Sequence, residues 1–113
     1  MDEVTGRAVR AAVRWLDEHQ GTGTEQLTIR ILKLQEEAGE AARAWIGVTG
    51  HNPRRGVTGT VEDVVAELAD TAFTALVAIE SLGIDSERAL ADCARKVLAR
   101  LESAAAPEPD RGS

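Results

Sequence analysis

Two short acidic segments carry the residue types and the spacing that could perform chemistry. The first reads EEAGE and the second, 26 residues further along, reads ELAD. Their acidic residues are Glu36, Glu37, Glu40, Glu67 and Asp70. Residues three apart in a helix lie about 60° from each other, so Glu37 shares a face with Glu40, and Glu67 shares a face with Asp70. Carboxylate oxygens suit hard cations, so the pattern predicts a Mg²⁺ or Mn²⁺ site and metal-assisted attack of water on a phosphoryl group.

Two predicted apolar stripes position these acids. A helix over 25–46 carries the stripe Leu27, Ile31, Leu34, Ala38, Ala41 and Trp45. A helix that begins near Val61 carries the stripe Val61, Val65, Leu68, Ala72, Leu76 and Ile79. Each carboxylate pair lies one residue before and two residues after a stripe position. If the two stripes pack together, both pairs come out along the same edge of the interface.

A solvated acidic surface is the alternative interpretation, because glutamates are common on exposed helices. Four converging carboxylates repel one another, and Lys33, four residues before Glu37, relieves part of that repulsion. Gly39 favours a site, because a glycine inside a helix costs about 1 kcal/mol relative to alanine. It indicates either a close helix approach or a ligand that needs room.

Two more helices complete the predicted all-α fold. A first helix over 4–19 and a fourth that begins at Asp85 or Ser86 carry apolar residues at helical spacing. Thr60 with Asp63 is spaced as a capping box, and Thr22 or Thr24 is expected to cap the helix that starts at residue 25. Residues 104–113 lack an apolar pattern and contain two prolines, which predicts a disordered tail after a single domain over 1–103.

Composition narrows the function classes. The formal net charge of −6 argues against coating a nucleic acid, and the chain has no apolar run long enough to suggest a membrane span. A single cysteine, Cys93, excludes a disulfide within the chain and is expected to be a small packing residue. The polar, acidic start does not resemble a signal peptide, so a cytoplasmic protein is expected.

The segment over 47–59 is a glycine-rich loop that contains Arg54 and Arg55. These arginines predict either a phosphate clamp or a solvated loop, and the residues alone do not separate the two. The spacing of the glycines does not match a P-loop. Trp15 and Trp45 could stack on a base, but the place of Trp45 on an apolar stripe favours core or subunit-interface packing.

EExxE followed by ExxD resembles the signature of the MazG-like all-α nucleoside triphosphate pyrophosphohydrolases. The resemblance covers residues 36–70, with helical flanks over 27–100. It implies a four-helix bundle completed by oligomerisation as a homodimer or homotetramer, and cleavage between the α- and β-phosphates. It also implies that the Mg²⁺ ligands, with Mn²⁺ as a possible substitute, are Glu37, Glu40, Glu67 and Asp70. Glu36 would support an additional ion or orient the attacking water.

The same resemblance suggests which basic residues meet the substrate. Lys96 and Arg100 are similar to the family's basic positions on the fourth helix, although the asparagine-containing motif that some members have before that lysine is not evident. With Lys33, Arg54 and Arg55 they form the predicted substrate-binding set. The leading hypothesis is a nucleoside triphosphate pyrophosphohydrolase without nucleic-acid or membrane partners. A metal- or nucleotide-binding regulatory protein with little turnover is the alternative, and a helical interaction module is disfavoured by the intact acidic set.

Overall fold

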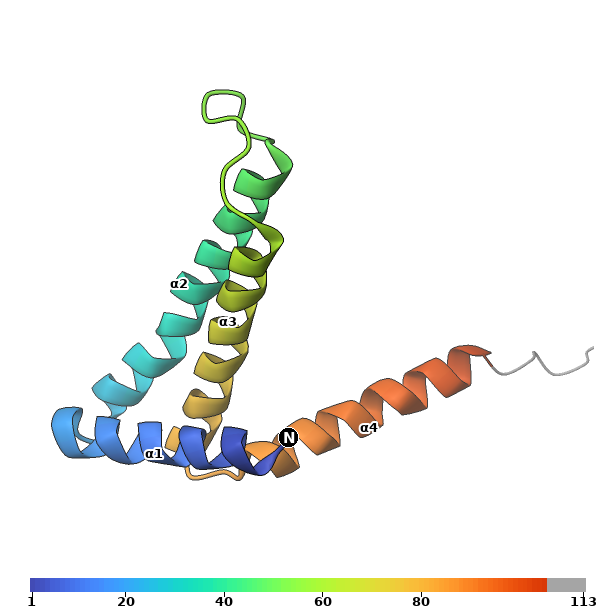
Figure 1. Ribbon diagram of the computed structural model, residues 1–113. Helices are drawn as coiled ribbons and strands as arrows, with labels where there is room; N and C mark the ends of the chain where they lie inside the picture. The colour runs from blue at the N-terminus through green and yellow to red at the C-terminus, as the bar shows by residue number, and fades with distance from the viewer. Residues whose placement is uncertain (106–113) are drawn as a thin grey trace, which may run out of the picture.

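The computed structural model describes residues 1–105, and these residues form four helices and no strand (Figure 1). The helices are α1 (Glu3–Gln20), α2 (Thr24–Thr49), α3 (Val61–Ser81) and α4 (Ser86–Ala105). The all-α prediction is therefore confirmed. Within this range, no helix is both long enough and apolar enough to cross a membrane.

Helix starts follow local sequence in α3 but not in α2. The Thr60 hydroxyl accepts the Asp63 backbone N–H at 3.3 Å, and the Asp63 carboxylate accepts the Thr60 N–H at 2.9 Å. This is the predicted capping box. The predicted cap of α2 by Thr22 or Thr24 was wrong. Gly23 takes the N-cap position without a side-chain hydrogen bond, and Thr24 is already helical.

The helices form an open arrangement rather than a closed bundle. α2 and α3 pack as an antiparallel hairpin, α1 lies across the base of that hairpin, and α4 projects away from it (Figure 1). The radius of gyration is 19.3 Å, whereas a compact domain of this length has about 13 Å. Within the described residues, the four-helix bundle expected from the sequence is thus not closed by one chain.

The core is small, and the two predicted stripes are only partly buried in it. The buried apolar side chains are Val9, Ala41, Val64, Val77 and Ala78. Ala41 and Val64 mark the line along which α2 and α3 touch. The stripe residues Trp45, Val65 and Leu68 lie to one side of that line and stay about half exposed, at 52, 57 and 54%. The stripes meet only in part, because Ala41 is buried whereas Trp45, Val65 and Leu68 border one open groove.

A buried arginine fixes α1 to the hairpin. The Arg30 side chain is only 4% exposed. Its Nη1 donates to Asp17 Oδ1 at 2.7 Å and to Ser81 Oγ at 3.1 Å, and its Nη2 donates to the Gly21 carbonyl at 2.8 Å. One side chain of α2 therefore bonds to α1, to the turn after it and to the end of α3.

The end of α4 differs from the predicted boundary. The helix continues through Ala105, two residues beyond the predicted end of the domain at residue 103. The rest of the predicted tail, 106–113, lies outside the described residues. Cys93 on α4 is exposed, so its prediction as a packing residue was wrong, since α4 projects away from the hairpin.

Candidate metal centre

Three carboxylates converge at the middle of the hairpin, and none of them lines the open groove. Glu37 comes from α2, and Glu67 and Asp70 lie one turn apart on α3. One carboxylate oxygen of each lies within 4.8 Å of the others. The antiparallel packing of α2 on α3 produces this meeting, because both acidic segments sit at the same height along the hairpin. The structure thus brings one acid of the first motif together with both acids of the second.

The other two predicted acids occupy different positions. Glu40 is half-buried and lies close enough for its charge to act on Glu67, but it is not one of the three converging carboxylates. Glu36 is exposed and stands next to Glu37 in the sequence. Glu40 therefore borders the cluster, and Glu36 lies outside it on the solvent side.

Within the cluster, Glu67 has a carboxylate whose negative charge is poorly compensated. Its Oε2 is buried and has no hydrogen-bond partner among the described residues. Burial, together with the negative charges of Glu40 and Asp70, raises the pKa of Glu67 above its ordinary value of 4.5. A buried acceptor without a donor is unfavourable, and a bound cation would satisfy it.

Lys33 supplies part of the missing positive charge. Its Nζ lies 3.2 Å from Glu37 Oε1, as its position one turn before Glu37 predicts. The hydrogen bond to Glu37 and the charge of that carboxylate raise the pKa of Lys33. One ammonium group does not balance Glu37, Glu67 and Asp70, so the cluster keeps a net negative charge.

The donor set fits a small hard cation. Mg²⁺ binds oxygen at about 2.0–2.1 Å, so opposite ligands of one ion lie about 4.2 Å apart. The carboxylate oxygens, which lie within 4.8 Å of one another, need only small side-chain adjustments to reach that spacing. A Cβ at Gly39 would meet only the Arg43 side chain, at 3.9 Å. A close helix approach therefore does not explain Gly39, while room for a ligand remains compatible with it.

The remaining predicted substrate contacts are not near the carboxylates within one chain. Arg54 and Arg55 are exposed in the loop at the far end of the hairpin, about three helical turns along α2 from Glu37 (Figure 1). Lys96 and Arg100 are exposed on α4, which projects away from the hairpin. Of the predicted basic residues, Lys33 is the one that the structure places at the site.

Sequence reasoning missed Arg30, although its position carried a signal. Arg30 stands three residues after Leu27 and four before Leu34, which is a stripe position occupied by a charge. A charged residue in an apolar stripe indicates a buried polar contact, and Arg30 makes three of them. Sequence reasoning also did not foresee that Arg30 borders a cavity.

No protein-family model matches this chain, and no curated protein or solved structure shows significant similarity to it. The assignment of the centre therefore depends on its own geometry and on the two acidic motifs.

Proposed function

We propose that the protein is a Mg²⁺-dependent hydrolase that cleaves nucleoside triphosphates to monophosphate and pyrophosphate, as do the MazG-like enzymes that its motifs resemble. The convergence of Glu37, Glu67 and Asp70, with a buried and unpartnered oxygen on Glu67, is the observation that carries this proposal. Clustered carboxylates repel one another, and a bound cation would relieve that repulsion.

Each acidic side chain of the site has a separate role in the proposed reaction. Glu37, Glu67 and Asp70 would hold the cation, and Glu40 borders them. A bound Mg²⁺ would neutralise phosphate charge and make it easier for the attacking water to lose a proton. Glu36, on the solvent side, orients the attacking water. The water oxygen bonds to the α-phosphorus, the bond between that phosphorus and the bridging oxygen breaks, and pyrophosphate leaves. The proton released by the water passes to a carboxylate or to solvent.

Basic side chains complete the proposed phosphate site. Lys33 bonds Glu37 at 3.2 Å and would meet a phosphate oxygen once Glu37 holds a cation. Arg54 and Arg55 reach the triphosphate if the loop folds back along the hairpin. Lys96 and Arg100 lie on a helix that leaves its own hairpin, so they would serve the site of a second copy.

A second copy of the chain is part of the proposal. The accessible surface is 8580 Å², whereas a compact monomer of 12.0 kDa exposes about 6,000 Å². The additional accessible surface of this chain is larger than the area of about 800 Å² that each partner buries in a standard protein–protein interface. The groove lined by Trp45, Val65 and Leu68 is almost wholly apolar, and none of the carboxylates lines it. We propose that a second copy covers this groove and leaves the acidic side open to substrate.

Product analysis tests the proposed activity. The purified protein is incubated with nucleoside and deoxynucleoside triphosphates and Mg²⁺, and pyrophosphate and orthophosphate are quantified separately. We expect equal amounts of monophosphate and pyrophosphate, no reaction in EDTA, and recovery with Mg²⁺ or Mn²⁺. Asp70→Asn should abolish turnover, while the matched change Glu25→Gln at an exposed site should not. Orthophosphate as the first product contradicts the cleavage position, and metal binding without turnover favours the regulatory alternative.

A further inference from the structure

The apolar side of α4 is uncovered in one chain. Its large apolar residues Leu90, Val97, Leu98 and Leu101 are exposed at 47, 44, 57 and 61%. In proteins, most of the stability of a helix comes from packing its apolar face. The 20 residues of α4 lack that contribution in one chain, so the helix needs a surface that covers this side.

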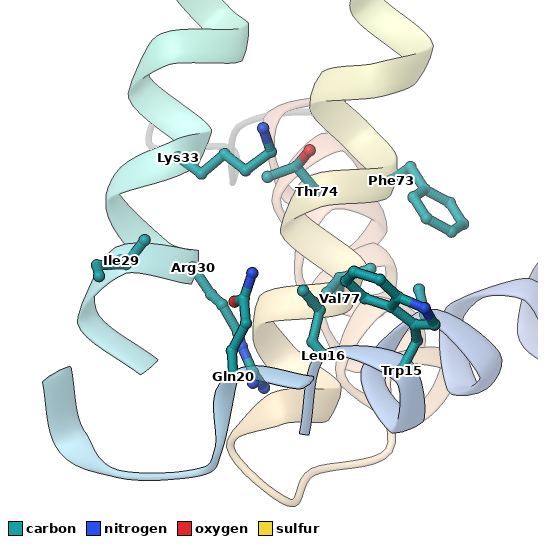
Figure 2. A pocket seen from close by; sticks show the side chains of 10 residues that line it. Trp15, Leu16, Gln20, Ile29, Arg30, Lys33, Phe73, Thr74 and Val77 are labelled. Atoms are coloured by element: carbon teal, nitrogen blue, oxygen red, sulfur yellow. The ribbon is translucent and has the colours of Figure 1, made fainter. Parts of the chain in front are cut away.

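The rest of the same chain does not supply that surface. Glu80 Oε1 accepts hydrogen bonds from the Ser86 N–H and from Ser86 Oγ, both at 3.0 Å, and Ser86 is fully buried. These bonds fix the corner at which α4 leaves α3. In the described chain, no α4 residue lines the cavity between α1, α2 and α3 (Figure 2) or the groove beside Trp45. The cover must come from another molecule.

The apolar residues of α4 follow the spacing of a coiled coil. Steps of four, three and four residues separate the core positions of a heptad repeat, and the same steps separate Leu90, Ala94, Val97 and Leu101. These four exposed residues form the α4 seam, and no charged residue belongs to it. The charged residues nearby lie on the outer side of the helix, where Arg95 pairs with Asp92.

The α4 seam is complementary to itself when two copies of the helix run antiparallel. The register that sets Leu90 against the partner's Leu101 also sets Ala94 against the partner's Val97. The small alanine then faces the larger valine, as close packing requires. Because α4 runs from Ser86 to Ala105, this register also overlaps the two helices over their full length.

Charge favours the antiparallel direction. α4 carries three acidic and four basic residues, so the net charge of −6 lies on the rest of the chain. Parallel pairing would bring two acidic hairpins to the same end, where they repel, whereas antiparallel pairing places them at opposite ends. Beside the seam, Arg100 would lie next to the partner's Cys93, so no like charges meet across the interface.

From the exposed seam, the fixed corner and this complementarity, we infer that α4 binds the α4 of another copy as an antiparallel pair. This interface is separate from the groove. The accessible surface exceeds that of a compact monomer by about 2,600 Å², enough for two interfaces to which each chain contributes about 800 Å².

The α4 pair joins groove dimers into tetramers. A seam of two heptads is short, so one pair alone does not hold two chains together at low micromolar concentration. A groove dimer carries two α4 helices, and two pairs that form together bind far more tightly than one. The tetramer therefore rests on the groove contact of the proposed function, whereas the α4 pair does not.

Disulfide trapping tests the α4 pair directly. Ala94→Cys and Val97→Cys chains, each with Cys93→Ser and one with an affinity tag, are co-expressed and equilibrated in a glutathione redox buffer. Disulfides form only between cysteines whose Cα atoms lie within about 7 Å, so we expect the mixed dimer at least fivefold above either homodimer. Ala99→Cys, on the outer side of α4, replaces Val97→Cys in the control and should give no mixed dimer. Homodimers alone, or no disulfide, overturn the antiparallel pair.

Measurements of mass test the assembly. Light scattering should show tetramers for the wild type and dimers for Val97→Lys, which places a charge in two layers of the seam. Ala99→Lys adds the same charge to the outer side and should remain tetrameric. A dimeric wild type or a tetrameric Val97→Lys overturns the α4 pair. A monomeric wild type that still gives the mixed disulfide overturns the groove contact and supports the α4 pair, and neither readout depends on hydrolysis.

Discussion

Arg30 of α2 and Asp17 of α1 form an ion pair, with Nη1 2.7 Å from Oδ1, where α1 turns into α2. The guanidinium is almost fully buried, whereas the Asp17 side chain is 37% exposed. The pair therefore combines a buried cation with a partly hydrated anion. With the bonds of Arg30 to Ser81 and Gly21, it sets how α1 lies against the hairpin.

Removal of this cation should destabilise the fold. We expect Arg30→Leu to lower the free energy of unfolding by about 2 kcal/mol, less than the 3–5 kcal/mol typical of a fully buried pair, because water can reach Asp17. Urea unfolding followed by circular dichroism measures the change. Arg43→Leu, at an exposed position of the same helix, is the control and should change stability by about 0.5 kcal/mol or less. If both variants lose the same free energy of unfolding, the contacts of Arg30 do not contribute to stability.

Mg²⁺ should stabilise the protein through Glu67. An ion bound only by the folded state raises stability by about 2.7 kcal/mol at 100 times its Kd. Glu67→Gln removes one of the repelling charges, so we expect a higher melting temperature without metal and a much smaller gain from Mg²⁺. Thermal melts with Mg²⁺ are compared with NaCl of equal ionic strength. An identical Mg²⁺ response in both proteins contradicts Glu67 as a ligand, and the same melts on Glu40→Gln decide whether Glu40 is one.

The raised pKa of Glu67 predicts a pH-dependent difference between these two proteins. The folded state takes up the Glu67 proton at a higher pH than the unfolded chain, so protonation favours folding. In EDTA, wild type should therefore gain stability relative to Glu67→Gln as pH falls through the raised pKa, and the gain should be complete below 4.5. Unfolding free energies from neutral pH to about pH 4 measure it. The prediction is refuted if the difference in unfolding free energy between wild type and Glu67→Gln stays constant with pH, or if the variant becomes relatively more stable at low pH.

Self-association should depend on the apolar groove. Val65→Asp places a charge in the groove, where Val65 is 57% exposed, and should shift the protein to monomers. Val57→Asp makes the same change in the loop, where Val57 is 72% exposed, and should leave association intact. Light scattering at low micromolar concentration reports the mass. A wild-type protein that is monomeric and active at that concentration would exclude the second copy from the proposal.

The sequence predicted the local features of this fold well, because those features depend on neighbouring residues. The capping box of Thr60 with Asp63 and the ion pair of Lys33 with Glu37 both follow from short-range rules. Periodicity also predicted that the two acidic pairs come out along one edge if the stripes pack together, and Glu37, Glu67 and Asp70 do meet in the structure. Each of these expectations required knowing only that the segments are helical.

Expectations that depended on packing partners failed or stayed untested. Periodicity identifies an apolar face but does not tell which molecule covers it. Val65 and Leu68 were predicted on a stripe facing α2, and Trp45 in a core or a subunit interface. All three are exposed in one chain. Buried polar residues were missed for a related reason. Arg30 interrupts a stripe, and its three partners come from segments up to 51 residues away, which a local pattern cannot reveal.

The acidic side and the apolar groove are two sides of the same pair of helices, and this limits how the length of the chain can change. One residue inserted between Arg30 and Glu37 would turn every later residue of α2 by about 100° around the helix axis. Glu37 would then point toward the groove and Trp45 away from it. We expect such an insertion to remove metal binding and self-association together. An insertion in the loop over 50–60 would not rotate the faces of α2 or α3. The loop should therefore tolerate insertions that the helices do not.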